Sequence, residues 1–274
     1  MNWLILGGTT EARLFTEQAC AEIVRGDLSL GNHGTEPTLI YSVAGRVRQP
    51  QLPCRVISGG FSAGGGLQRY LQVEAIQGIL DFTHPFAARI STAAVAAARA
   101  QGIPCWRFRR PPWRARAGDR WQCFSTRDDL WQALGHFKSI LLTLGQLTPA
   151  EWEALLSVVT PGQGQRLVIR TAVAPGMTLP EGVEWLQAIG PFCLEDEIRL
   201  LTNAQIDVLV TKNSGGQATQ AKLNAARQLQ VPVLMLDRPV LPPADHEFET
   251  IEQGLNDLKH YLTQTEHAGY PDVF

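Results

Sequence analysis

Residues 4–12 read Leu4-Ile5-Leu6-Gly7-Gly8-Thr9-Thr10-Glu11-Ala12. The apolar run predicts a short buried strand, and apolar residues recur at helical spacing from Thr10 to Val24. A glycine turn between a strand and a helix is typical of the loop that binds a dinucleotide pyrophosphate, because glycines allow close approach and a helix N-terminus attracts anions. The stretch departs from Gly-x-Gly-x-x-Gly, so an ordinary turn capped by Thr9 or Thr10 is the alternative.

The same alternation of short apolar runs and helical patterns continues along the chain. Strands are expected at Leu39–Val43, Val56–Ser58, Gly78–Asp81 and Pro104–Phe108, and a second series runs from Ile140–Leu144 to Val233–Leu236. A last helix is expected over Phe248–Thr263. Repeated strand–helix units imply parallel sheets with helices on both faces.

We therefore expect an α/β fold of two Rossmann-like domains, each a mainly parallel sheet flanked by helices, with a cleft between them. The expected domains are residues 1–130, which would hold the cofactor, and residues 131–274. The last helix is expected either to stay with residues 131–274 or to pack back on the first domain. Ligands of such sheets bind beyond the carboxyl ends of the strands, where this sequence places its Gly, Ser, Thr, His and Lys residues.

Composition narrows the function classes. The 274 residues are 45% hydrophobic and 18% charged, which is ample for a packed core and argues against disorder. The net charge of −2 argues against a nucleic-acid partner, although residues 1–120 carry fourteen arginines against eight acidic residues. No apolar run approaches the ~20 residues of a membrane span, and residues 1–8 lack the basic start of a signal peptide, so a cytoplasmic protein is expected. The scattered cysteines and histidines predict no metal site, and a monomer or small homo-oligomer is expected.

The end of the second predicted strand bears on the choice of cofactor. An NAD-binding domain carries an acidic residue there for the ribose 2′-hydroxyl, whereas an arginine accommodates the 2′-phosphate of NADP. Here the segment is Ser42-Val43-Ala44-Gly45-Arg46, with no acid. We expect NADP, with Arg46 on the phosphate and Ser42 assisting; the alternative is that Arg46 is a solvated loop residue.

Two further loops combine polar residues with the start of a helix. His84 follows the strand that ends at Asp81, and could act as a general acid or simply bond the loop backbone. Thr211–Gly216 joins Lys212, Ser214 and glycines at a helix start, which is typical of a phosphate- or carboxylate-binding turn, with a plain turn as the alternative.

An arginine- and aromatic-rich segment covers Trp106–Arg116. Arginines of this kind bind carboxylates through two hydrogen bonds and stack on flat rings. The same residues suit nucleic acid, and a solvated connector between domains is the alternative.

Taken together, the loops resemble one family over almost the whole chain, the precorrin-6A reductase (precorrin-6x reductase) family of cobalamin biosynthesis. The order and spacing of several stretches carry the resemblance: Leu4–Ala12, Ser42–Arg46, Gly59–Leu71, Asp81–Ser91, Arg107–Trp113, Leu141–Gly145, Gly190–Glu197, Val210–Gly216 and Pro232–Pro239. The resemblance implies a two-domain α/β enzyme without metal. It would transfer hydride from NADPH to the precorrin-6A macrocycle, or to its cobalt analogue, giving precorrin-6B.

The expected sites follow from the loops and the resemblance together. The cofactor-binding residues are expected to be Gly7, Gly8, Thr9, Thr10, Glu11, Ser42, Arg46, Gly59 and Gly60. The residues expected to bind the anionic tetrapyrrole are Thr83, His84, Arg107, Arg109, Arg110, Lys212, Ser214 and Gly215. His84 is a candidate proton donor beside water. The alternatives are another NADP-linked reductase of an anionic metabolite and a non-catalytic tetrapyrrole carrier.

Overall fold

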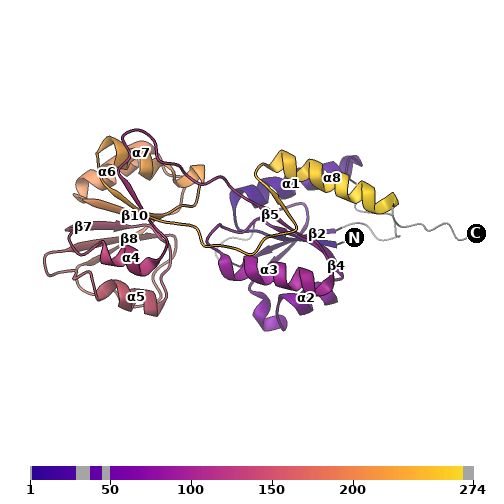
Figure 1. Ribbon diagram of the computed structural model, residues 1–274, viewed down its shortest axis with the longest axis horizontal. Coiled ribbons are helices and arrows are strands. Elements are labelled where there is room, and N and C mark those ends of the chain that lie inside the picture. The colour runs from indigo at the N-terminus through magenta and orange to yellow at the C-terminus, as the bar shows by residue number, and fades with distance from the viewer. Residues whose placement is uncertain (1, 29–37, 45–49, 268–274) are drawn as a thin grey trace, which may run out of the picture. The chain divides into compact units, whose positions relative to one another are not determined.

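A computed structural model describes residues 2–28, 38–44 and 50–267 and divides the chain into two compact units. The first unit joins Met1–Pro111 to Val240–Phe274, and the second is Pro112–Pro239 (Figure 1). The expected boundary at 130/131 therefore lies too late. Strand β6 (Trp121–Phe124), which no apolar run marks, pairs with β11 (Val233–Leu236) and so belongs to the second unit.

The sheet of the first unit is parallel throughout the described residues. Its strands, in spatial order, are β12 (His246–Phe248), β5 (Cys105–Phe108), β4 (Ile76–Asp81), β1 (Asn2–Leu6), β2 (Thr38–Val43) and β3 (Arg55–Ser58). The chain runs outward from β1 to β3 and then restarts at β4 on the other side of β1. This reversal makes the carboxyl ends of β1 and β4 the place where an open α/β sheet binds its ligand.

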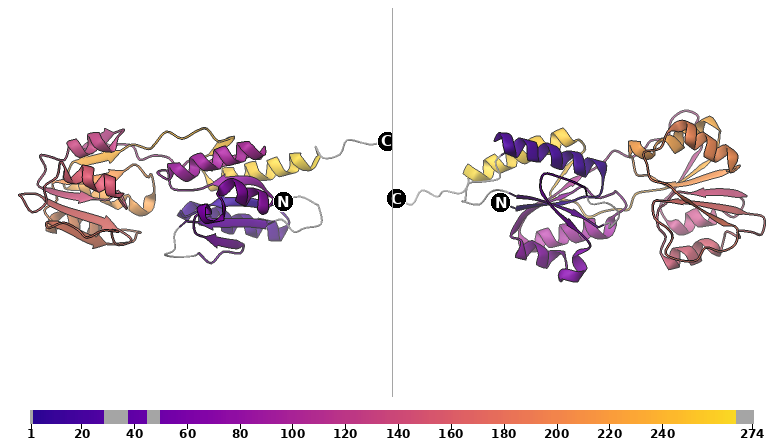
Figure 2. Two further views of the ribbon diagram at one scale, coloured as in Figure 1. Left: turned by 90° about the horizontal axis from the view of Figure 1, so that it is seen from below. Right: turned by 180° about the vertical axis from the view of Figure 1, so that it is seen from behind.

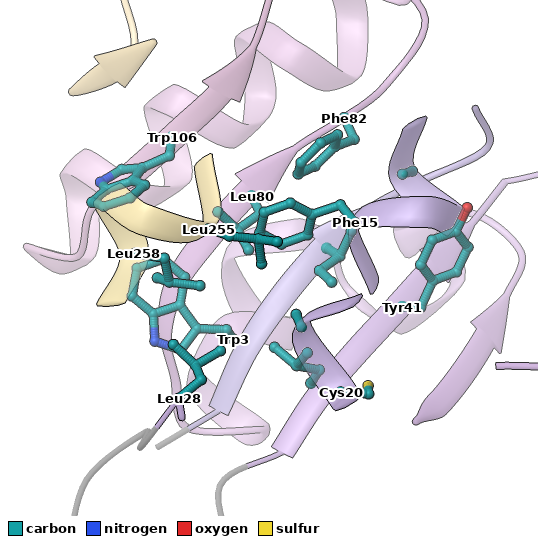
Figure 3. Packing of buried hydrophobic residues seen from close by; sticks show 14 of the residues in the cluster. Trp3, Phe15, Cys20, Leu28, Tyr41, Leu80, Phe82, Trp106, Leu255 and Leu258 are labelled. Atoms are coloured by element: carbon teal, nitrogen blue, oxygen red, sulfur yellow. The ribbon is translucent and has the colours of Figure 1, made fainter. Parts of the chain in front are cut away.

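Both faces of β1 are buried because its residues alternate between two cores. Trp3 and Ile5 face a cluster with Phe15 of α1 (Thr10–Arg25) and Leu258 of α8 (Ile251–His267). Figure 3 shows Trp3, Phe15 and Leu258 in this cluster. Leu4 and Leu6 face a second cluster with residues of α2 (Leu67–Val73) and α3 (Ala88–Gln101). Figure 2 shows α1 and α8 side by side on one face of this sheet. The four consecutive apolar residues of β1 are thus all buried because helices cover both faces of the sheet at this strand.

The second unit repeats this plan. Its strands, in spatial order, are β6, β11, β10 (Val208–Lys212), β7 (Ser139–Leu142), β8 (Arg166–Thr171) and β9 (Val183–Gln187), and those pairings are parallel. Helices α6 (Leu194–Asn203) and α7 (Ala221–Gln228), with the short η2 (Gln217–Thr219) before α7, lie on one face, and α4 (Arg127–Gln132) and α5 (Pro149–Leu156) on the other (Figure 1). The order reverses between β7 and β10, so their carboxyl ends form the equivalent ligand-binding edge.

The last expected helix begins later than predicted. The helix expected over Phe248–Thr263 begins only at Ile251, because His246–Phe248 is the edge strand β12, paired with Trp106–Phe108. Phe248 is buried in the core of the first unit, and Leu255, Leu258 and Leu262 of α8 pack on the same cluster. Within the described ranges, no helix is long and apolar enough to cross a membrane.

Candidate functional site

A pocket of about 620 Å³ opens at the carboxyl edge of the first sheet. Five of the expected site residues line it: Gly7, Ser42, Gly59, Gly60 and Thr83. They come from the ends of β1, β2, β3 and β4, which are separated in sequence and brought together by the parallel order of the strands. The volume lies within the range of about 300–1,000 Å³ that is usual for pockets that hold small molecules or cofactors.

The glycine loop after β1 is fixed by its neighbour β2. The Gly7 amide donates to the Ser42 carbonyl at 2.8 Å, and the Gly8 amide donates to the Tyr41 hydroxyl at 2.9 Å. Gly8 has φ of +102°, which a residue with a side chain rarely adopts, and its backbone is exposed. The loop therefore presents bare backbone to the pocket edge in a fixed conformation.

Thr9 serves as the N-cap of α1. Its hydroxyl accepts the Ala12 amide at 3.1 Å and donates to the Phe82 carbonyl, beyond β4, at 2.8 Å. This is the capping role that the sequence left as an alternative, and it joins the loops after β1 and β4. Thr10, the first residue of α1, is exposed.

Glu11 and Arg110 form an ion pair at the start of α1. The guanidinium of Arg110 comes from the segment after β5, and both side chains are largely buried. A carboxylate at a helix N-terminus is favoured by the helix dipole, and the arginine paired with it neutralises its negative charge. The structure thus places one expected substrate residue next to one expected cofactor residue.

The cation expected for a 2′-phosphate, Arg46, lies outside the described residues. A cation that does line this pocket was not expected. Arg89, in the first turn of α3, is one of the lining residues, together with Ser42 and Gly59, and is exposed. Among the described residues, its guanidinium makes no hydrogen bond or ion pair. No feature of the sequence distinguishes Arg89, since an arginine in the first turn of an alanine-rich helix is usually a solvated residue.

Asp81 organises the loop after β4. One carboxylate oxygen accepts the amide and the hydroxyl of Thr83, at 3.1 and 2.7 Å, and the other accepts Arg107 Nε at 3.1 Å. The Thr83 hydroxyl also lies 3.0 Å from that of Ser91. His84 is the next residue, and its Nδ1 accepts the Phe86 amide at 3.2 Å. The structure therefore shows the backbone-bonding role for this histidine, through its Nδ1.

The arginines after β5 differ in their surroundings. Arg107 is buried, pairs with Asp81 and donates to the Pro242 carbonyl at 2.8 Å. Arg109 is exposed and pairs with Glu247 at 2.9 Å. The internal partners of Arg107 indicate that it supports the sheet edge rather than a ligand, whereas Arg109 is accessible.

The Lys212 loop lies at the carboxyl edge of the second sheet. Asn213 holds it to the backbone of Trp113, accepting the Trp113 amide at 2.8 Å and donating to its carbonyl at 3.1 Å. Ser214 is buried and Gly215 has φ of +71°. Burial, with a smaller contribution from Arg127, lowers the pKa of Lys212 to about 8. The loop therefore has a fixed conformation and a partly desolvated cation.

A second lysine lies beside this loop and was not expected. Lys222 of α7 is only 5% exposed, and its Nζ donates to the Thr143 hydroxyl at 3.3 Å and lies 5.6 Å from the centre of the Trp113 ring. Burial, with the charge of Arg170, lowers its pKa to about 7. The sequence carries a signal for it, because Lys222 occupies an inward position of α7 together with Leu223, Ala225 and Ala226.

Within the described ranges, no group of three or more His, Cys, Asp or Glu residues is arranged to hold a metal ion. The two sheet edges instead offer backbone amides, hydroxyls and cations. These groups suit anionic ligands such as phosphates and carboxylates.

Comparisons with known proteins agree with this arrangement. A family described as precorrin-6x reductase CbiJ/CobK matches residues 2–259. A precorrin-6A reductase of Rhodococcus erythropolis is 39% identical over 250 residues, covering 90% of this chain and 93% of the relative. One from a Sinorhizobium species is 37% identical over 262 residues, covering 94% and 93%. The solved structure of a CobK precorrin-6A reductase matches with a TM-score of 0.78 at 32% identity, covering 95% of this chain and 96% of that one.

Proposed function

The chain belongs to the precorrin-6x reductase family, and on that premise we propose that it reduces precorrin-6A to precorrin-6B in cobalamin biosynthesis, in the cytoplasm, with NADPH as the reductant. One observation carries the cofactor part of the proposal. The pocket at the reversal point of the first sheet is lined by Gly7, Ser42, Gly59 and Gly60, which the sequence assigns to a dinucleotide. The two relatives reported above are both named precorrin-6A reductase, so we propose precorrin-6A rather than its cobalt analogue as the substrate.

The described residues fit a dinucleotide phosphate. The exposed backbone of Gly8, in a conformation that a side chain disfavours, and the first residue of α1 leave a pyrophosphate room at a helix N-terminus. Arg89 supplies a cation on the pocket wall that pairs with none of the other residues described by the structure. Arg46, outside the described residues, remains the proposed ligand of the 2′-phosphate, with Ser42 beside it.

NADPH, when bound, supplies the hydride. The protein's own groups orient the reactants: Thr9 ties the glycine loop to the loop after β4, and Asp81 fixes Thr83 and, through it, the start of that loop. The proton that the macrocycle also needs comes from water or from Nε2 of His84.

The macrocycle carries acetate and propionate carboxylates around its ring. We propose that Lys212, Ser214 and Gly215 at the edge of the second sheet bind one of these groups, and that Arg109 binds another. Arg110 acts through its pair with Glu11, and Arg107 is left out because its partners are internal.

The test is NADPH oxidation, followed at its near-ultraviolet absorption band, with precorrin-6A supplied. Oxidation that requires precorrin-6A and yields precorrin-6B supports the proposal. Oxidation only with a different anionic metabolite would instead identify another reductase, and binding of precorrin-6A without oxidation would identify a carrier. Arg46→Ala tests the cofactor: KM for NADPH should rise more than KM for NADH, and equal effects would contradict the 2′-phosphate assignment.

A further inference from the structure

Lys222 is a buried lysine that takes part in none of the ion pairs among the described residues. Its ammonium group instead contacts the Thr143 hydroxyl and the ring of Trp113. Burying an unpaired ammonium costs several kcal/mol in general, and proteins reduce this cost by releasing the proton. A lysine kept in such a place for packing alone would be replaced at no loss by an apolar residue of the same length.

The groups that face Lys222 come from every element packed around it. Arg170 lies at the end of β8, Glu197 on α6, Lys212 at the end of β10, and the Thr143 hydroxyl follows β7. Glu197 is committed to Arg170, whose Nη1 donates to its Oε1. The other oxygen of Glu197 is buried without a hydrogen-bond partner, so Lys222 does not satisfy it.

The net charge of this cluster is therefore positive whenever Lys222 is protonated. Among the described residues, Lys222 and Arg170 would carry two positive charges against the one carboxylate of Glu197. Arg127 of α4 adds a further cation near Lys212. An incoming carboxylate would compensate this excess, and it would be attracted most strongly by the fully protonated cluster.

The cluster lies at the carboxyl edge of the second sheet, where such sheets bind their ligands. Thr143 directly follows β7 and Lys212 ends β10, and these two strands flank the point where the strand order of the second sheet reverses. Lys222 contacts Thr143 from α7, one helix after the Lys212 loop. Lys222 therefore lies near Lys212, in the loop that we propose to bind a substrate carboxylate.

We propose that Lys222 takes up a proton from solvent when a carboxylate of the macrocycle binds beside Lys212, and that this protonation is part of substrate binding. The inference rests on the proposed function and adds a positioning residue to it. The amine is mostly neutral in the unliganded protein at pH 8, since its pKa is about 7. A bound carboxylate favours the charged form and raises that pKa, so that binding consumes a proton and weakens as the pH rises from 7 to 9.

The experiment is calorimetric titration of the full chain with precorrin-6A at pH 8, in buffers with different heats of ionisation. The wild-type protein should take up about one proton at Lys222, with a further fraction at Lys212, whose pKa is about 8. Lys222→Met should lose the larger share of this uptake and bind about tenfold more weakly. Lys222→Arg, which keeps a permanent charge, should bind with an affinity that falls less steeply than that of the wild type between pH 7 and 9, because only Lys212 of the two then titrates in this range. Lys138→Met, which removes an exposed lysine of the same unit, should behave as wild type.

The outcomes separate this inference from the proposed function. If the wild-type protein neither binds precorrin-6A nor oxidises NADPH with it, both are overturned. If it does both, but Lys222→Met takes up as many protons as wild type, the inference alone is wrong. A thermal unfolding curve for each variant identifies any that fails to fold, and Lys222→Arg then provides the test through its pH profile.

Discussion

The ring of Tyr41 occupies the space into which a side chain at Gly7 would project. A methyl group at Gly7 would overlap the ring, whose hydroxyl accepts the amide of Gly8 at 2.9 Å. Burial raises the pKa of Tyr41, so the phenol keeps its proton over the physiological range. The first glycine of the loop is thus required by protein packing, whereas the second is required by its backbone conformation.

Gly7→Ala should therefore destabilise the first unit and weaken cofactor binding together. The added methyl group forces the Tyr41 ring or the loop to move, which costs about 1–3 kcal/mol in a packed region. Urea unfolding and the KM for NADPH measure the two effects. Gly64→Ala is the matched control, because no atom lies within 4 Å of the added carbon. Equal stabilities for the two variants would contradict the packing argument.

Arg89→Leu should raise the KM for NADPH about tenfold with little change in kcat, because a hydrogen bond to a charged group is worth about 1.5–3 kcal/mol. Arg89 lines the pocket and has no other partner within the described residues, so its loss should not affect folding. Initial-rate kinetics check the expectation. Arg99→Leu, an exposed arginine on the same helix, serves as the control. Identical KM values for both variants would remove Arg89 from the cofactor site.

The sequence predicts the central strands well because their signal is local. In β1, four apolar residues are buried on both faces, so the run is apolar without interruption. The edge strands β6 and β12 are short and half exposed, and their residues become strands only through partners far along the chain. Missing β6 is what displaces the predicted domain boundary.

The residues of the candidate site likewise differ in whether a local feature of the sequence predicts them. Glycines such as Gly7 and Gly59 are predicted because a turn after a strand needs them locally. Arg107 is an apparent free cation in the sequence, yet its partner Asp81 lies opposite it on the neighbouring strand, 26 residues away in the chain. Whether an arginine or lysine is paired, exposed or buried depends on tertiary contacts. The sequence therefore does not distinguish Arg89, and it marks Lys222 only through its place among the inward positions of α7.

Asp81→Asn should destabilise the first unit by at most about 3–5 kcal/mol, because the buried guanidinium of Arg107 then keeps only the more distant carboxylate of Glu247, at 3.4 Å, as an anionic partner within the described residues. The double variant Asp81→Asn with Arg107→Met should lose less, since it removes the guanidinium charge as well. Chemical unfolding of the single and double variants measures this. Arg109→Met provides the contrast, because its exposed pair with Glu247 contributes about 1 kcal/mol or less. A double variant less stable than Asp81→Asn would show that the pair is not the source of the effect.

Lys222 also makes the stability of the unliganded protein depend on pH. Its pKa is about 7 in the folded protein and has a reference value of 10.5, so between these values the unfolded chain binds more protons and the free energy of unfolding rises with pH. Below pH 7 the amine is protonated in both states, and the cost of burying its charge is fully expressed. The whole difference corresponds to at most about 5 kcal/mol.

Lys222→Met lacks this contribution, so its free energy of unfolding should exceed that of the wild type by more at pH 6 than at pH 9. Urea unfolding of both proteins, with Lys138→Met as the exposed-lysine control, checks this, and parallel pH profiles for wild type and Lys222→Met would show that the amine does not titrate in this range.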